Sequence, residues 1–195
     1  MTTLKAEKRN MQTKAKKLRR EGFVTGVVFG REMKESLPIQ ITKADAERIL
    51  KTKNKGSQIM LDVDGQIMDV LIKEIDYNFM KNQIDEMDFQ ALVKGEKVHS
   101  VAEVYLLNHD KVTTGVLQQL LHEIAFKATP DALVEKVEID VGNLRVGDSI
   151  QVKDLDIAKK QDLELMTDPE AVVVTVSESH NAPVEDAEGE TEKTE

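Results

Sequence analysis

The sequence contains no cysteine and no tryptophan, and aromatic residues make up only 4% of it. Without cysteine the chain has no disulfide bond, no thiolate nucleophile and no cysteine-based zinc site, which fits a reducing compartment. The scarcity of aromatic side chains argues against a large aromatic-lined ligand pocket. No apolar run approaches the ~18 residues of a membrane span, and the N-terminus lacks the apolar segment of a secretory signal. We therefore expect a cytoplasmic protein.

Signatures of catalysis and of nucleotide or metal binding are also missing. The segment GREMKESLP after Gly30 has neither the second glycine nor the GK[ST] ending of a phosphate-binding loop, and the four histidines lack the spacing of metal ligands. Asp85, Glu86 and Asp88 lie close together in QIDEMDF, but this motif holds no histidine, lysine or tyrosine as an acid–base partner. The pattern favours a solvated turn. We expect no enzyme, no cofactor, no metal ion and no small-molecule substrate.

The charges that are present are unevenly distributed along the chain. Residues 1–100 hold 19 basic and 15 acidic side chains, whereas residues 101–195 hold 8 basic and 21 acidic ones. The first 20 residues alone carry eight cations against one acid, Glu7. Such asymmetry indicates that the N-terminal half faces a polyanion and the other half does not.

The cations concentrate in the stretch TKAKKLRREGF, which follows Lys8-Arg9. It can form a short helix with Met11, Ala15 and Leu18 inward and Gly22 as its stop, which would leave the cations pointing outward. Such a cluster can contact several phosphates in one groove, although charge runs are also typical of a solvated surface. Composition alone leaves both interpretations open.

Short strands dominate the rest of the first half. TLKAEKR alternates Leu4 and Ala6 with polar neighbours, and FVTGVVFG is rich in β-branched residues. In QIMLDVDGQIMDVLIKEI, Asp64-Gly65 separates two apolar stretches, which is the composition of a two-residue type I′ hairpin turn. Between them, ITKADAERILKTKNKG predicts a helix that begins at a Thr42 cap. Its inward face would hold Ala46, Ile49 and Leu50.

From about residue 95 the acids outnumber the bases, and the strands continue. Strand-like segments are LVKGEKVHSVAEVYLL, HEIAFKAT, VEKVEIDVGNL, DSIQVKDL and EAVVVTVSE, while TTGVLQQLL is expected to form a short helix between strands. Residues 180–195 hold six acids, one base and only Val184 as a sizeable apolar group, so they cannot bury enough surface to offset the entropy of ordering. The sequence therefore predicts a β-rich domain over 95–179 and a disordered acidic tail over 180–195.

Three motifs occur in an order that is typical of one protein family. Leu18-Arg19, Gly22 and Phe29-Gly30 fill the places of a basic run ending in LRxxG and of a Tyr-Gly pair. Lys73-Glu74 and Asp88-Phe89 match an IKE stretch followed by HxDF, and GVLQ and IDVGNLRVGDSI follow downstream. With these motifs, almost all of residues 3–178 resembles the bacterial large-subunit ribosomal protein L twenty-five in its long two-domain form, the general stress protein Ctc family. Glu86 stands where the family usually has histidine, and Phe29 where it has tyrosine.

The resemblance implies a mainly β fold with few helices (α+β), in which a small β-barrel over 1–94 precedes the domain over 95–179. Family members bind 5S ribosomal RNA through the barrel, in the central protuberance of the large subunit. Because A-form RNA is read mainly from its shallow minor groove through phosphates and 2′-hydroxyls, the basic stretch is expected to face phosphates. The expected partners are 5S RNA, the large subunit and, through the second domain, neighbouring ribosomal proteins. The protein would then be ribosome-associated.

The residues expected to bind RNA follow from the basic stretch and the family motifs. Six cations are expected as phosphate contacts: Arg9, Lys14, Lys16, Lys17, Arg19 and Arg20. The resemblance adds Lys73 as a groove contact and Asp88 as an acceptor for a base amino group or a 2′-hydroxyl, with a local turn cap as the alternative role of Asp88. Phe29 is expected either to stack on RNA or to pack in the barrel core.

A competing interpretation is an interaction protein that works off the ribosome. In that case the protein would be a stress-related factor, and its acidic second domain would recruit a basic protein partner.

Overall fold

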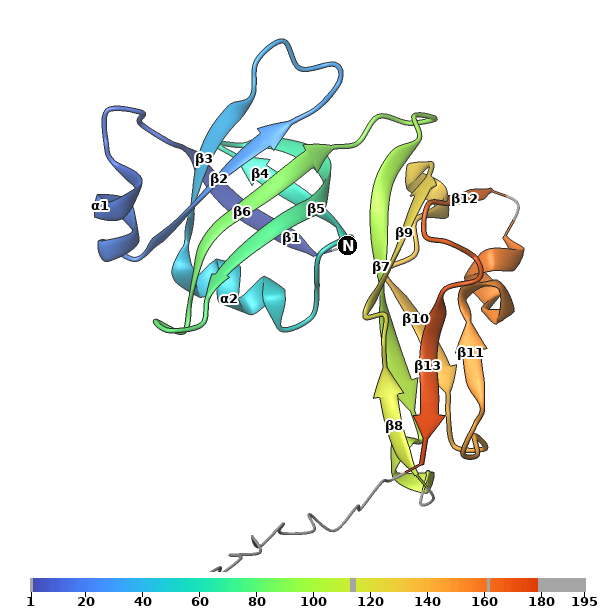
Figure 1. Cartoon of the computed structure of the whole chain (residues 1–195). Helices are drawn as coiled ribbons and strands as arrows, with labels where there is room; N and C mark the ends of the chain where they lie inside the picture. The colour runs from blue at the N-terminus through green and yellow to red at the C-terminus, as the bar shows by residue number, and fades with distance from the viewer. Residues whose placement is uncertain (1, 113–114, 161, 179–195) are drawn as a thin grey trace, which may run out of the picture.

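The computed structural model describes residues 2–112, 115–160 and 162–178. Over these ranges the chain is mainly β with two α-helices, and a closed barrel is followed by a second β-rich region (Figure 1). The predicted fold class is confirmed. The acidic tail over 180–195 lies outside the described residues. Among the helices in the described ranges, none is long and apolar enough to cross a bilayer.

Six strands form a closed barrel, in which strands such as the first and the fourth bury every second side chain. Their order is β1 (Thr3–Lys8), β3 (Leu37–Thr42), β2 (Phe23–Phe29), β6 (Gln83–Ala91), β5 (Gln66–Asn78) and β4 (Gln58–Val63). Two of the pairings are parallel, β1 with β4 and β2 with β6. The inward side chains form one apolar core, which includes Leu4, Val28, Ile39, Ile59, Leu61 and Phe89.

The predicted hairpin and the longer helix are confirmed. Asp64 and Gly65 join β4 to β5 with φ values of 52° and 89°, and a type I′ turn requires positive φ at both of its central residues. Helix α2 (Lys43–Leu50) begins at Thr42, whose Oγ1 accepts a hydrogen bond from Asp45 N at 3.2 Å. Ala46 and Ile49 of this helix are buried against the barrel core.

The basic stretch forms a shorter helix than expected, α1 (Ala15–Arg20). Leu18 is its buried residue, and Gly22, at φ 89°, follows its last turn as predicted. The inward placement of Met11 was wrong, since 68% of this residue is exposed. Thr13 N bonds to Asn10 O, so Met11 lies in a turn before the helix rather than on its inner face.

The second β region is built from two sheets around its own core. One sheet has the order β10 (Lys136–Asp140), β7 (Val98–Leu107), β9 (Glu123–Ala128) and β12 (Leu163–Leu165), and the other has the order β11 (Ser149–Gln151), β13 (Val172–Ser177) and β8 (Val116–Gln119). Short 3-10 helices η1 (His109–Lys111), η2 (Pro130–Ala132), η3 (Val152–Asp154) and η4 (Asp156–Lys159) connect them. The core includes Val104, Ile124, Phe126, Val141 and Val173.

The helix expected in TTGVLQQLL was wrong, because Val116–Gln119 is strand β8. It pairs antiparallel with β13, and Val116 lies opposite Ser177. A segment of four residues gains its stability from this distant partner. Local periodicity cannot reveal such a partner, because a short apolar run fits a helix as well as a strand.

The barrel and the second region contact each other through the loop that follows α2. Lys53 Nζ lies 2.6 Å from Glu135 Oε1, and Lys55 Nζ lies 3.1 Å from Glu123 Oε2. A Cβ atom added at Gly56 would lie 2.0 Å from Val101 O, so the two backbones touch where no side chain fits. Residues 92–97 connect β6 to β7, and the boundary near residue 95 remains a prediction.

Candidate nucleic-acid interface

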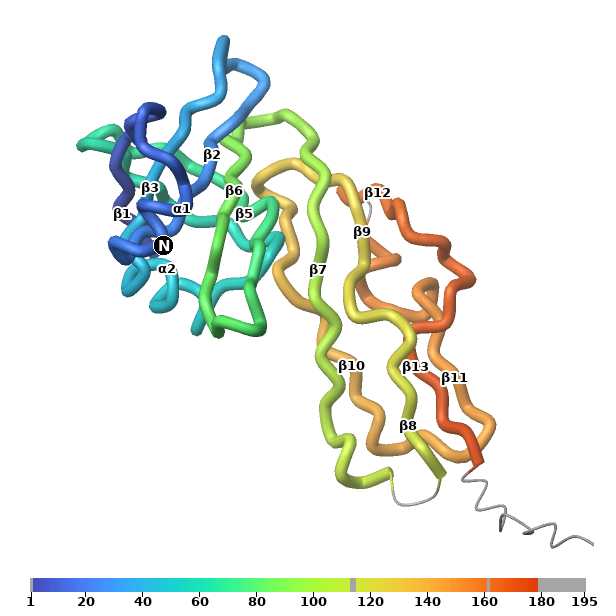
Figure 2. The backbone as a smooth tube through the Cα atoms, turned by 60° about the vertical axis from the view of Figure 1, so that its left-hand side comes forward, coloured from blue at the N-terminus to red at the C-terminus, as the bar shows by residue number. Residues whose placement is uncertain are grey.

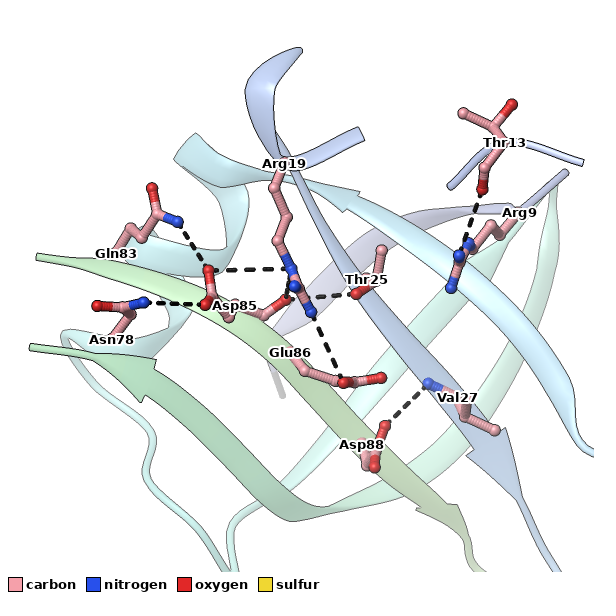
Figure 3. Close-up of polar contacts among 10 residues, drawn as sticks. All are labelled: Arg9, Thr13, Arg19, Thr25, Val27, Asn78, Gln83, Asp85, Glu86 and Asp88. Carbon is pink, nitrogen blue, oxygen red and sulfur yellow. Dashed lines mark hydrogen bonds and ion pairs between the residues drawn. The ribbon is translucent and has the colours of Figure 1, made fainter. Parts of the chain in front are cut away.

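Helix α1 lies on the outside of the barrel (Figure 1) and packs against β2, while Arg19 reaches across to β6 (Figure 3). Leu18 anchors it as the one buried residue of the helix. Beneath it, Thr25 of β2 is only 1% exposed, and its Oγ1 donates to Asp85 O at 3.3 Å. The helix therefore has a fixed seat on the barrel wall.

Four of the predicted phosphate contacts point into solvent from this helix and its N-terminal residue: Lys14, Lys16, Lys17 and Arg20. Lys17 lies 3.7 Å from Glu21, but its side chain remains 70% exposed. An exposed pair of this kind contributes little to stability and opens easily. These four cations therefore form a positive ridge, defined here as Lys14, Lys16, Lys17 and Arg20.

Arg19 turns the opposite way and does not point outward as expected. Its Nε donates to Asp85 O at 3.0 Å, and its Nη2 lies 3.8 Å from Glu86 Oε2 (Figure 3). Only 28% of its side chain is exposed. Arg19 therefore fastens α1 to β6, so the structure gives it a positioning role within the chain.

The three carboxylates of QIDEMDF lie in strand β6, so the expected solvated turn was wrong. Hydrogen bonds from Gln83 Nε2 at 2.7 Å and Asn78 Nδ2 at 3.2 Å, in that order, lower the pKa of Asp85. Partial burial raises the pKa of Glu86, and Asp88 adds to the shift, while Arg19 opposes it. The strand thus places negative charge directly beside the base of the positive ridge.

Asp88 supplies a side-chain hydrogen bond to the parallel pairing of β2 with β6. Its Oδ1 accepts a hydrogen bond from Val27 N of β2 at 3.1 Å (Figure 3). The alternative of a local turn cap is therefore wrong, since the donor lies 61 positions away. Burial raises the pKa of Asp88, and the Val27 hydrogen bond partly opposes that shift.

Arg9 lies just beyond β1, at the far side of this face (Figure 3). Its Nη2 donates to Thr13 O at 3.3 Å, which holds the turn that leads into α1. Its Nε is buried and has no hydrogen-bond partner among the described residues. Arg9 is therefore partly buried against the barrel, and its Nε faces the protein and not the solvent.

Lys73 and Phe29 do not join the positive ridge. Lys73 Nζ donates to His99 O of β7 at 2.8 Å, so it faces the second region and not the seat of α1. Burial lowers the pKa of Lys73, and nearby Lys55 lowers it further. Phe29 is half-buried at the end of β2. Lys73 therefore lies apart from the positive ridge, and its predicted role as a groove contact stays a prediction.

Sequence reasoning missed the residues that support the ridge. Thr25, Asn78 and Gln83 hold Asp85 and the strand beneath α1, yet none of them is charged and the sequence patterns assigned none of them a role. It also missed the exposed tip of the β5–β6 hairpin, where 85% of Phe79 and 99% of Met80 are exposed. Two large apolar side chains within a polar turn were the one signal that local sequence offered.

Comparison with known proteins gives matches along nearly the whole chain. Residues 4–89 match the Ribosomal L25p family, and residues 97–180 match the family described as Ribosomal protein TL5, C-terminal domain. The chain is 32% identical to "Large ribosomal subunit protein bL25" of Enterococcus faecalis, over 91% of this chain and 88% of the relative. Proteins of the same description from Thermosipho africanus and Bacillus pumilus are 34% and 30% identical, over 92% and 98% of this chain and 85% and 93% of theirs.

Proposed function

Because the chain belongs to the ribosomal L25p family, in a long form with a TL5-type C-terminal domain, we propose that it binds 5S ribosomal RNA through the outer face of its barrel. Family membership makes the protein a structural constituent of the large ribosomal subunit, associated with the ribosome and not an enzyme. The competing interpretation of a stress factor that works off the ribosome receives no support from these relatives.

The positive ridge is the observation that carries the RNA proposal. Its four cations are all exposed on α1 and its N-cap residue, and the helix cannot swing freely because Leu18 and Arg19 hold it on the barrel. Phosphate contacts supply most of the affinity of such interfaces, and A-form RNA offers them across a shallow minor groove. A group of exposed lysines and an arginine on a fixed helix suits that target, and Arg9 lies beyond it toward β1.

The carboxylates of β6 would meet the RNA between these cations. Asp88 Oδ1 accepts from Val27 N, which leaves Oδ2 to accept from a base amino group or a 2′-hydroxyl. Glu86 would bring a negative charge toward phosphates, but Arg19 lies 3.8 Å from it and offsets that charge. We include Phe29 as a half-buried ring at the edge of the same strand pair, β2 and β6.

The salt dependence of binding tests this proposal. The full chain is titrated against 5S RNA by filter binding between low and moderate salt. Four phosphate contacts predict a slope of log K against log[salt] of roughly −3 to −4. Arg20→Ala is expected to flatten the slope by about one, because it removes one exposed contact.

Two further arginines provide the controls. Arg48→Ala removes a side chain that is 66% exposed on the other helix, α2, and is expected to leave the slope unchanged. Arg19→Ala is expected to lower both RNA affinity and thermal stability, since Arg19 fastens α1 to β6. A slope near zero for the unaltered chain, or equal effects of Arg20→Ala and Arg48→Ala, would contradict the proposal.

A further inference from the structure

Strand β10 has a neighbouring strand on one side only. It ends the four-stranded sheet and pairs with β7 alone in the part of the chain that the structure describes. Backbone groups of Glu135 and Val141, at its two ends, bond to β7. Because the bonding direction alternates along a strand, the N–H and C=O groups of Lys136, Glu138 and Asp140 point away from β7, toward the free edge.

A groove of about 670 Å³ runs along this free edge. One wall is β10, and the other is formed by Ile150 of β11 and by the η3–η4 segment between Asp154 and Lys160. Figures 1 and 2 show β10 beside β7, at the edge of its sheet. The groove therefore has the shape and the backbone donors that an added strand requires.

The base and the rim of the groove differ in chemistry. Val137, Ile139, Leu155 and Ile157 form an apolar base and are almost fully buried within the core. Charged residues on its walls are four acids and two lysines: Glu138, Asp140, Asp154, Asp156, Lys136 and Lys160. Residues 101–178 as a whole hold 7 basic and 15 acidic side chains. Lys136 pairs with Glu138 and Lys159 with Asp156. Asp140 and Asp154 have no cation within ion-pair distance among the described residues, so the groove keeps a net negative charge that favours a segment of positive charge.

We propose that this groove binds an extended, basic segment of a protein partner, which adds as a strand to the free edge of β10. Backbone hydrogen bonds to Lys136, Glu138 and Asp140 would supply the register, and alternate apolar side chains would reach the base of the groove. Basic side chains between them would meet the acids of the rim. This binding site is separate from the positive ridge and does not depend on RNA binding.

Charge argues against two other occupants. The chain's own tail over 180–195 carries six acids and one base, so the acidic rim repels it. A second copy that pairs antiparallel about Glu138 would place two like charges directly opposite each other, which is destabilising. A basic segment from another protein avoids both repulsions.

The probe is a synthetic peptide of alternating lysine and valine, labelled and titrated against the full chain by fluorescence anisotropy. Glu138→Pro removes the one N–H at the centre of the free edge and none of the bonds to β7, and proline is tolerated on edge strands. We expect it to weaken peptide binding about tenfold, which corresponds to about 1.4 kcal/mol, the scale of one hydrogen bond. Glu138→Gln keeps the N–H and should weaken binding only about twofold to threefold.

Matched controls separate this site from general attraction between opposite charges. An alternating glutamate–valine peptide should not bind. Glu164→Lys makes a full charge reversal on β12, at the opposite edge of the same sheet, and should change the affinity less than twofold. Equal affinity of the Glu138→Pro variant and the unaltered chain, or absence of binding, overturns the proposal.

Hydrogen exchange provides a second reading that needs no variant. Bound peptide should protect residues 136–140 of the unaltered chain, and protection confined to other segments overturns the proposal. A chain without residues 179–195 that binds the peptide more than tenfold tighter would identify the tail as the occupant. Dimers that form with rising concentration and that the peptide dissociates would identify a second copy of the chain as the occupant of the groove. Either result overturns the assignment to a partner protein.

Discussion

Asp88 occupies a place in the barrel wall where a backbone carbonyl would ordinarily accept the N–H of Val27. A carboxylate fills this place at the cost of partial burial, and that burial raises the pKa of Asp88. The folded chain therefore holds this proton more tightly than the unfolded chain does. The contribution of Asp88 to the unfolding free energy grows as the pH falls through its raised pKa and is lost as the pH rises.

Two substitutions at Asp88 separate its hydrogen bond from its charge. Asp88→Ala leaves Val27 N–H without an acceptor and should lower the unfolding free energy by about 1–3 kcal/mol. Asp88→Asn keeps an accepting oxygen and removes the charge, so it should be close to neutral at pH 7 and should flatten the dependence of stability on pH. Urea unfolding at neutral and mildly acidic pH measures both effects. Equal losses for the two variants would show that the hydrogen bond is not the stabilising feature.

Single residues also show which parts of the candidate interface could be predicted from the sequence. The charge run identified the ridge, because Lys14, Lys16 and Arg20 point outward as a solvated basic helix requires. It could not separate Arg19 from Arg20, since the difference depends on Asp85, 66 positions further along the chain. The family motif likewise identified Lys73, whose amino group turned out to face His99 of the second region.

Among the elements, those with a local signal were predictable and those held by distant partners were not. The hairpin at Asp64-Gly65 and the Thr42 cap of α2 each depend on a few adjacent residues, and both are confirmed. Strand β8 and the carboxylate-rich part of β6 depend on pairing with β13, β2 and β5. Taken alone, the sequence of β8 fits a helix and that of the carboxylate-rich part of β6 fits a turn, so the partner strands decide both.

The parallel pairing of β2 with β6 requires glycine at position 26. A Cβ at Gly26 would lie 2.0 Å from Met87 O, and the backbone of β6 cannot move away without loss of the pairing. Gly26→Ala should therefore lower the unfolding free energy by about 3 kcal/mol. Gly65→Ala is the matched control, since its Cβ meets open space and only its positive φ is strained, at about 1 kcal/mol. Similar losses of unfolding free energy for Gly26→Ala and Gly65→Ala in urea unfolding would show that the β2–β6 pairing shifts to accommodate the added Cβ.

On the scale of the whole molecule, the two halves carry opposite charge and still contact each other through ion pairs. Lys53 and Lys55, from the basic half, reach Glu135 and Glu123 of the acidic half. Asn54 reinforces the contact through hydrogen bonds to Glu103 and to Tyr105 Oη. The contact is polar and closely packed, so it sets the position of the second region relative to the ridge.

A charge exchange tests whether this contact holds the halves together. Lys53→Glu and Glu135→Lys should each lower the unfolding free energy by about 1 kcal/mol, and the double variant should recover most of that loss. The pair Lys55 and Glu123 is more exposed, with 44% and 47% of the side chains accessible, and the same exchange there should stay within about 0.5 kcal/mol. Thermal unfolding of the six variants gives both coupling energies. No recovery in the double variant would show that the pair does not couple the halves.

Because the parallel pairings join strands far apart in the sequence, the barrel closes late during synthesis of the chain. β1 must wait for β4, and β2 must wait for β6, before either parallel pairing can form. Helix α1 is synthesised early, but Asp85, which receives Arg19, leaves the ribosome 66 residues later. A nascent chain that ends before β6 therefore carries the basic ridge without its seat. The ridge becomes rigid only when the barrel is complete, so an unfinished chain presents its cations as a loose arm rather than as a shaped RNA-binding face.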